Sequence, residues 1–153
     1  MRTNGDKMKI YLDIDGVLLK KNLTMPEYGV EFIQFLITNF DCYWLTTHCR
    51  GGHNKAVDYL SKYYPASTVE KLRMIKQTDW TDLKTEAMDL HSHFIWLEDF
   101  PFESEKLVLR KHNKIDALIT INLNRKDELE LVEKQIQSIS AKYNNSLNII
   151  NKI

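Results

Sequence analysis

Short apolar segments alternate with stretches of helical periodicity along most of this 153-residue chain. When a strand is followed by a helix and a second strand, the connection is a right-handed crossover between parallel strands. The alternation therefore predicts an α/β fold in three layers, in which helices cover both faces of a mostly parallel, five-stranded sheet. The expected strands are Met8–Ile14, Cys42–Thr46, Arg73–Thr78, His93–Glu98 and Asp116–Asn122.

Four stretches have the apolar spacing of amphipathic helices. They comprise residues 30–37 after Pro26, residues 56–63 before Pro65, Lys84–Leu90 and Lys126–Tyr143. Internal repeats and Gly/Ser-rich or Pro-rich linkers are absent from the sequence, so residues 1–153 are expected to form a single domain.

The composition argues against several classes of partner. The formal net charge is zero, from 21 basic and 21 acidic residues, and this balance lacks the basic excess of most nucleic-acid and membrane binders. A local basic cluster still leaves a nucleic-acid partner open; it consists of Lys106, Arg110, Lys111 and Lys114. Two cysteines cannot form a disulfide framework, and no apolar run approaches the ~20 residues that span a bilayer. Because Met1–Lys9 is also polar, we expect a cytoplasmic protein without a membrane partner.

Acidic residues follow two of the expected strands, at the end of a parallel sheet where ligands bind. The first strand ends in Asp13-Ile14-Asp15-Gly16-Val17, and alternation along an extended chain places Asp13 and Asp15 on one side. An EF-hand loop would need an oxygen ligand at Val17 and a glycine one residue later, and neither is present. The fourth expected strand runs into Glu98-Asp99. Two acidic pairs at neighbouring strand ends predict a bound cation, and carboxylate oxygens favour Mg²⁺.

Three further signals are weaker and stay ambiguous on their own. Thr46, after the second strand, could donate a hydrogen bond to a phosphate oxygen, or it could form a turn or a helix cap. Lys84 could offset negative charge at the site or be an ordinary solvated lysine. His48, Cys49 and His53 lie close together, but their spacing matches no established zinc pattern.

These motifs, taken in order, resemble those of the haloacid dehalogenase superfamily. The resemblance runs from Met8 to about Asn122: Asp-x-Asp-Gly-Val, an apolar strand with Thr, a Lys, and an apolar strand with an acidic pair. It implies a Rossmann-like fold with Asp13 as nucleophile, Asp15 as general acid and base, Thr46 as the phosphate-binding hydroxyl and Lys84 as the motif lysine. It also implies a Mg²⁺ site made by Asp13, the Asp15 carbonyl and Asp99, with Glu98 in support. Glu98 departs from the family pattern, which more often has Asp.

The resemblance implies a Mg²⁺-dependent phosphomonoester hydrolase that forms an aspartyl-phosphate. Residues 16–41 and 47–83, where relatives insert cap domains, leave no room for an α/β cap. A capless site suits a bulky or macromolecular phosphorylated substrate, or closure by a second subunit in a homo-oligomer. Thr47, His48 and Arg50 are the expected substrate-binding residues. The alternative is a non-catalytic phosphate- or partner-binding domain that retains the fold, and the presence of both Asp13 and Asp15 argues against it.

Overall fold

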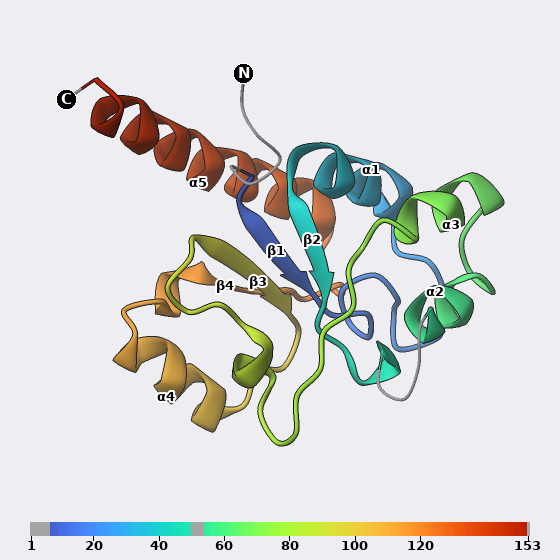
Figure 1. The fold of residues 1–153 in the computed structure, drawn as a ribbon. Helices are drawn as coiled ribbons and strands as arrows, with labels where there is room; N and C mark the ends of the chain where they lie inside the picture. Colours follow the sequence, from blue (N-terminus) through green and yellow to red (C-terminus); the bar gives the residue numbers. More distant parts are fainter. Residues whose placement is uncertain (1–6, 50–53, 153) are drawn as a thin grey trace.

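Four parallel strands form the sheet of the computed structural model, which describes residues 7–49 and 54–152 (Figure 1). The order across the sheet is β2-β1-β3-β4, and all neighbours are parallel. In this register Leu12 of β1 lies opposite both Trp44 of β2 and Leu97 of β3, so three adjacent strands end at the same edge. The strands are β1 (Lys9–Leu12), β2 (Asp41–Trp44), β3 (Phe94–Glu98) and β4 (Leu118–Thr120).

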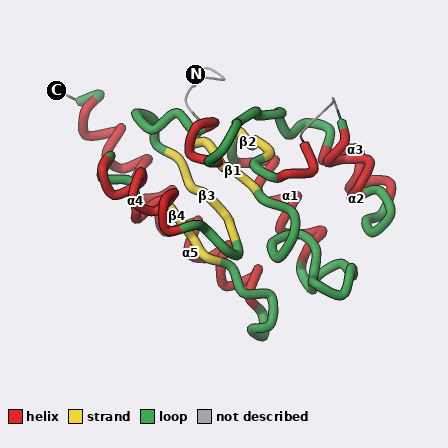
Figure 2. The backbone as a smooth tube through the Cα atoms, turned by 90° about the horizontal axis from the view of Figure 1, so that it is seen from below, coloured by secondary structure: helices red, strands yellow, loops and turns green. Residues whose placement is uncertain are grey.

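The described part of the chain also contains five α-helices and three short 3-10 helices; all but α5, which follows β4, lie between strands. The α-helices are α1 (Gly29–Asn39), α2 (Lys55–Leu60), α3 (Ala66–Leu72), α4 (Glu103–Lys111) and α5 (Glu128–Ile150). The 3-10 helices are η1 (Thr47–Cys49), η2 (Lys84–Ala87) and η3 (Ile115–Ala117). Helix α1 packs against α3 and α5, whereas α4 packs against η2 and η3. Helices α1 and α4 lie on opposite sides of the strands (Figure 2).

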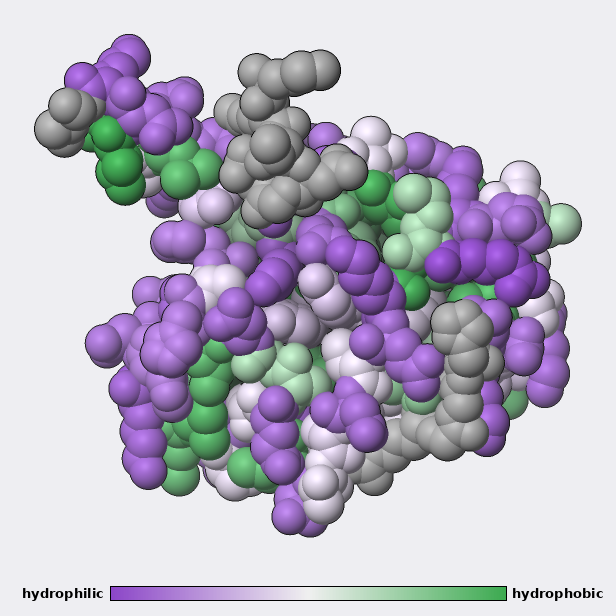
Figure 3. Space-filling model, viewed as in Figure 1, coloured by the Kyte–Doolittle hydropathy of each residue, from purple (hydrophilic) through white to green (hydrophobic). Residues whose placement is uncertain are grey.

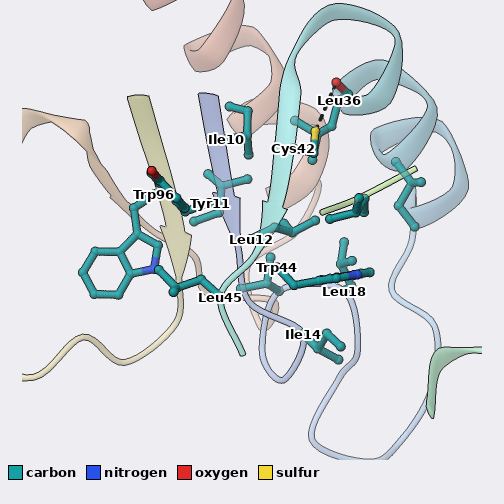
Figure 4. Packing of buried hydrophobic residues seen from close by; sticks show 14 of the residues in the cluster. Ile10, Tyr11, Leu12, Ile14, Leu18, Leu36, Cys42, Trp44, Leu45 and Trp96 are labelled. Carbon is teal, nitrogen blue, oxygen red and sulfur yellow. Dashed lines mark hydrogen bonds between the residues drawn. The ribbon is translucent and has the colours of Figure 1, made fainter. Parts of the chain in front are cut away.

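The two central strands, β1 and β3, are almost wholly buried, whereas burial alternates along β2. Figure 4 shows Leu12 of β1 beside Trp44 of β2, and the Cys42 thiol donating to the Leu36 carbonyl at 3.4 Å. All five residues of β3 are buried, so both of its faces are covered. Polar side chains cover most of the face seen in Figure 3. In the parts of the chain described by the structure, no helix combines the length and hydrophobicity needed to cross a membrane.

The sheet has four strands, and the fifth expected strand, Arg73–Thr78, is not formed. Only Lys76 pairs with β2: its N–H donates to the Cys42 carbonyl at 2.9 Å and its carbonyl accepts from Trp44 at 2.8 Å. Met74 is 67% exposed, so the segment lacks the buried alternation that would extend the pairing. The expected helix at Lys84–Leu90 is reduced to η2, while α3 and α4 are additional to the expected helices.

Candidate metal and catalytic site

Three carboxylates meet at the edge where β1 and β3 end. Asp13 follows β1, Glu98 is the last residue of β3 and Asp99 follows it. One oxygen from each lies within 4.8 Å of the others, and we call these three residues the acid cluster. Asp13 and Glu98 are buried, at 6% and 3% exposure, and Asp99 is half-buried. The fold therefore brings together the two acidic motifs that are separated in sequence.

Lys84 is the counter-charge of the acid cluster. Its Nζ lies 3.2 Å from Asp13 Oδ2 and 2.6 Å from Glu98 Oε2, and its side chain is only 16% exposed. Burial lowers the pKa of Lys84, but the charges and hydrogen bonds of the two carboxylates raise it by more, so the lysine stays charged. Lys84 is thus not an ordinary solvated lysine but a partner of two members of the acid cluster.

One ammonium group does not balance three carboxylates. Burial, followed by the hydrogen bond and negative charge of Asp13, raises the pKa of Glu98 well above its ordinary range, despite the opposing effect of Lys84. Such an upward shift is expected where carboxylates crowd together away from water. A divalent cation would relieve this repulsion, and the donors are the hard oxygens that Mg²⁺ prefers.

The two members of the acidic pair have different surroundings. Glu98 Oε1 accepts from the N–H groups of Asp99 at 3.1 Å and Phe100 at 3.3 Å, and its Oε2 accepts from Lys84. Both oxygens of Glu98 are therefore already engaged by the protein. The Asp99 carboxylate makes no hydrogen bond or ion pair with residues 7–49 or 54–152, so it is the member free to bind a cation.

Gly16 makes room for Asp99. Its φ is +77°, and a Cβ at this position would collide with the Asp99 carboxylate. The chain turns sharply here because the Ile14 carbonyl accepts from the N–H groups of Leu18 at 2.8 Å and Leu19 at 3.1 Å. The turn places the backbone after Asp13 against Asp99, which only glycine permits without strain.

Glu105 fixes the backbone that carries Lys84. Its Oε2 accepts from the Lys84 N–H at 2.9 Å and its Oε1 accepts from the Phe102 N–H at 2.9 Å, with the side chain 2% exposed. One carboxylate thereby ties the start of η2 to the start of α4. Glu105 is not recognisable as part of the site from the sequence alone. A Glu in the first turn of a helix signals a cap, but its bond to a residue 21 positions away depends on the tertiary fold.

Asp15 points to a different set of partners. Its Oδ2 lies 2.9 Å from His48 Nε2, and Tyr59 donates its hydroxyl to Oδ1 at 3.4 Å. The His48 and Tyr59 rings are stacked with centroids 3.8 Å apart. Burial and the charge of Asp15 raise the pKa of Tyr59, so its hydroxyl remains a donor. The helical spacing of residues 56–63 predicts only a helix that contains Tyr59, because nothing in the sequence links Tyr59 to Asp15.

The remaining expected site residues lie near the end of β2. Thr46 is buried, and its Oγ1 accepts from the His48 N–H at 3.3 Å; it makes no hydrogen bond with the acid cluster or Lys84. Thr47 and His48 line a shallow pocket of about 380 Å³ together with Lys55, Asp58, Tyr59 and Lys62.

Arg50 and His53 lie outside the described residues. Within the described ranges the acid cluster is the only group of three or more His, Cys, Asp or Glu side chains placed so that they could hold a metal ion. Cys49 does not belong to it: its thiol donates to the Thr46 carbonyl at 3.0 Å.

The site therefore combines the buried Asp13 carboxylate with the Lys84 ammonium and the unengaged Asp99 carboxylate. The exposed Asp15 carboxylate, which contacts the side chains of His48 and Tyr59, follows Asp13 by two residues. This combination suits nucleophilic attack, cation binding and proton transfer at one strand edge. No protein-family model matches this chain, and neither curated proteins nor solved structures match it.

Proposed function

We propose that this protein is a Mg²⁺-dependent phosphomonoester hydrolase in which Asp13 forms an aspartyl-phosphate. The observation that carries the proposal is the contact of Lys84 with both Asp13 and Glu98, at 3.2 and 2.6 Å, inside the acid cluster. A buried nucleophilic carboxylate needs positive charge beside it before it can approach an anionic phosphate. The fold supplies one such charge in Lys84 and oxygen ligands for a second.

Asp13, Asp99 and the backbone carbonyl of Asp15 would hold the Mg²⁺ ion. Glu98 would support them indirectly, because it fixes Lys84 and the turn that carries Asp99. When bound, the ion offsets the negative charge of the carboxylates and of the transferring phosphoryl group.

The protein's own groups divide the remaining chemistry among them. Asp13 attacks phosphorus in line with the leaving group, while Lys84 and the Thr46 hydroxyl hold the phosphoryl oxygens. Asp15 gives a proton to the leaving oxygen and later takes one from the water that hydrolyses the intermediate. Proton transfer of this kind contributes about 10²–10⁴ in rate. His48 and Tyr59 orient the Asp15 carboxylate through the bonds described above.

The proposal includes a three-layer, Rossmann-like single domain without a cap. The described residues between 16 and 41 contain α1, and those between 47 and 83 contain η1, α2 and α3. An uncovered site suits a substrate that is large on its open side, or one that a second copy of the chain covers. The proposal also places the protein in the cytoplasm, in keeping with two unpaired, buried cysteines.

Hydrolysis of p-nitrophenyl phosphate tests the proposal. We expect turnover that requires Mg²⁺ and falls to background in Asp13→Asn, which keeps the shape of the side chain and removes the nucleophile. Asp116→Asn, the same change at an exposed position, should retain wild-type turnover. Circular dichroism would show that both variants are folded.

Two results would contradict the proposal. Turnover in folded Asp13→Asn would exclude a covalent intermediate on that residue. A wild-type protein without any Mg²⁺-dependent turnover, on this ester or on a panel of phosphometabolites and phosphopeptides, would instead indicate a non-catalytic phosphate-binding domain.

A further inference from the structure

A pocket of about 560 Å³ opens directly beside the acid cluster. Gly16 and Asp99 line the end nearest the cluster, and the loop after β4 forms much of the rest. This volume is in the range of pockets that bind small molecules. A phosphate on Asp13 would therefore have a built cavity next to it, on the Asp99 side of the site.

The pocket is rich in positive charge. Lys20, Lys21 and Arg125 line it, and Asp99 is the only acidic residue among its described lining. None of the three cationic side chains forms an ion pair with residues 7–49 or 54–152. In a chain of zero net charge, three cations gathered in one cavity without anionic partners point to an anionic ligand.

The wall that carries Arg125 is fixed relative to the acid cluster. The Ile121 N–H donates to the Glu98 carbonyl at 2.9 Å, which joins the loop to the last residue of β3. The Asn122 N–H donates to the Glu128 carboxylate, and the Asn122 carbonyl accepts from the Arg125 N–H at 3.0 Å. The backbone of Arg125 is thus held at a defined place with respect to β3, from which its exposed side chain can reach into the pocket.

Charge also limits how far an anion can extend. A second pocket of about 390 Å³ shares Lys20 and Arg125 with the first. Beyond them its charged lining consists of four acidic residues and one lysine: Glu27, Asp127, Glu128, Glu130 and Lys126. A polyanion continuing in that direction would meet these acids, so the favourable ligand ends at Lys20 and Arg125.

We propose that the pocket binds a second anionic group, phosphate or carboxylate, on a small phosphomonoester substrate. The carbon spacer between the two anions would lie along Phe100, which is 74% exposed, and Leu123. The inference rests on the proposed function for the identity of the reacting phosphate. It names the substrate class: compact molecules with an anion at each end.

Matched substrates test this assignment. We compare kcat/KM for 1,4-butanediol bisphosphate, 5-phosphonooxypentanoate and n-butyl phosphate, which share a chain of four carbons after the ester oxygen and differ at its far end. The two esters that carry a second anionic group should exceed butyl phosphate by about tenfold, the value of one charge-assisted contact. Arg125→Gln and Lys21→Gln should each reduce this ratio severalfold. Lys134→Gln, an exposed lysine on α5, should leave it unchanged.

Three outcomes would overturn the assignment. These are equal kcat/KM values for the esters with and without a second anionic group, a ratio unaffected by both pocket variants, and a preference confined to a phosphoserine peptide with flanking aspartates. The last would identify a macromolecular substrate instead of a small one.

A binding experiment separates this inference from the hydrolase proposal. 1,4-Butanediol bisphosphate is titrated into Asp13→Asn protein without Mg²⁺, and the amide resonances of Ile121 and Arg125 are followed by NMR. The resonances should shift, and the additional change Arg125→Gln should weaken binding severalfold. Binding to this variant, combined with a wild-type protein that shows no phosphatase activity, would keep the anion site and reject the hydrolase. Phosphatase activity of the wild-type protein without shifts of the Ile121 and Arg125 resonances would reject the anion site alone.

Discussion

At the scale of single residues, position 16 excludes a side chain for two independent reasons. Its φ of +77° is unfavourable for any residue with a Cβ, and the Cβ would occupy the space of the Asp99 carboxylate. We expect Gly16→Ala to lower the free energy of unfolding by about 1–2 kcal/mol. It should also weaken Mg²⁺ binding, because Asp99 must move. Denaturant unfolding and calorimetric titration with Mg²⁺ measure the two effects.

Gly29→Ala is the matched control for this substitution. A Cβ there would come within 2.7 Å of the Tyr64 hydroxyl, so stability should again fall, but its near neighbours, Tyr64, Met25 and Pro26, include no residue of the acid cluster. Mg²⁺ affinity should therefore stay at the wild-type value. If Gly16→Ala also kept wild-type affinity, Asp99 would not be a metal ligand.

At the scale of elements, Glu105 links α4 to η2 and so positions Lys84. Glu105→Ala leaves the N–H groups of Lys84 and Phe102 without their acceptor, which costs about 1–3 kcal/mol for each buried group. We expect lower stability and a fall in kcat, because Lys84 loses its fixed place against Asp13. Chemical denaturation and steady-state kinetics check the two results.

Glu103→Ala on the same helix separates this effect from a general loss of helix stability. Glu103 is exposed and pairs with Lys106 at 3.1 Å, a contact typically worth about 0–1 kcal/mol. Stability and kcat should change little. A Glu105→Ala protein with wild-type kcat would show that Lys84 does not depend on this link.

At the scale of the whole molecule, the absence of a cap from the described segments predicts a site that binds its ligand without domain closure. BeF₃⁻, which mimics a phosphoryl group on a carboxylate, should bind Asp13 in the presence of Mg²⁺. Small-angle scattering curves with and without it should superpose, because α1, α2 and α3 are too short to swing over the site as a cap domain would. Water would then be excluded by the substrate or by a second subunit.

Closure by many ångströms in the BeF₃⁻ complex would contradict this prediction. Crystal structures of the two states would show which segment moves. A lid formed from residues 16–41 or 47–83 would also show that neither the substrate nor a second subunit is needed to cover the site.

The sequence by itself determined the parallel α/β class and the strand ends at which the acids lie. Periodicity and composition are local properties, so β1, β2, β3 and β4 were all anticipated to within a few residues. The expected strand Arg73–Thr78 failed because pairing at a sheet edge depends on neighbouring backbone, and only Lys76 finds a partner there. Helix α4 was missed because its sequence is mostly polar and its place depends on contacts made by Glu105.

Only the tertiary structure decided how these residues act together. It made Lys84 a partner of two acids, engaged both oxygens of Glu98 and left Asp99 unengaged. It also placed His48 and Tyr59 on Asp15, and gathered Lys20, Lys21 and Arg125 in one pocket. The contacts of Lys84 with Asp13 and Glu98, of Asp15 with His48 and Tyr59, and of Arg125 with the pocket of Lys20 join residues distant in sequence, so their geometry arises from packing across the sheet and its loops. The sequence shows which functional groups are present and in what local pattern, whereas the packed fold determines which of these groups contact one another.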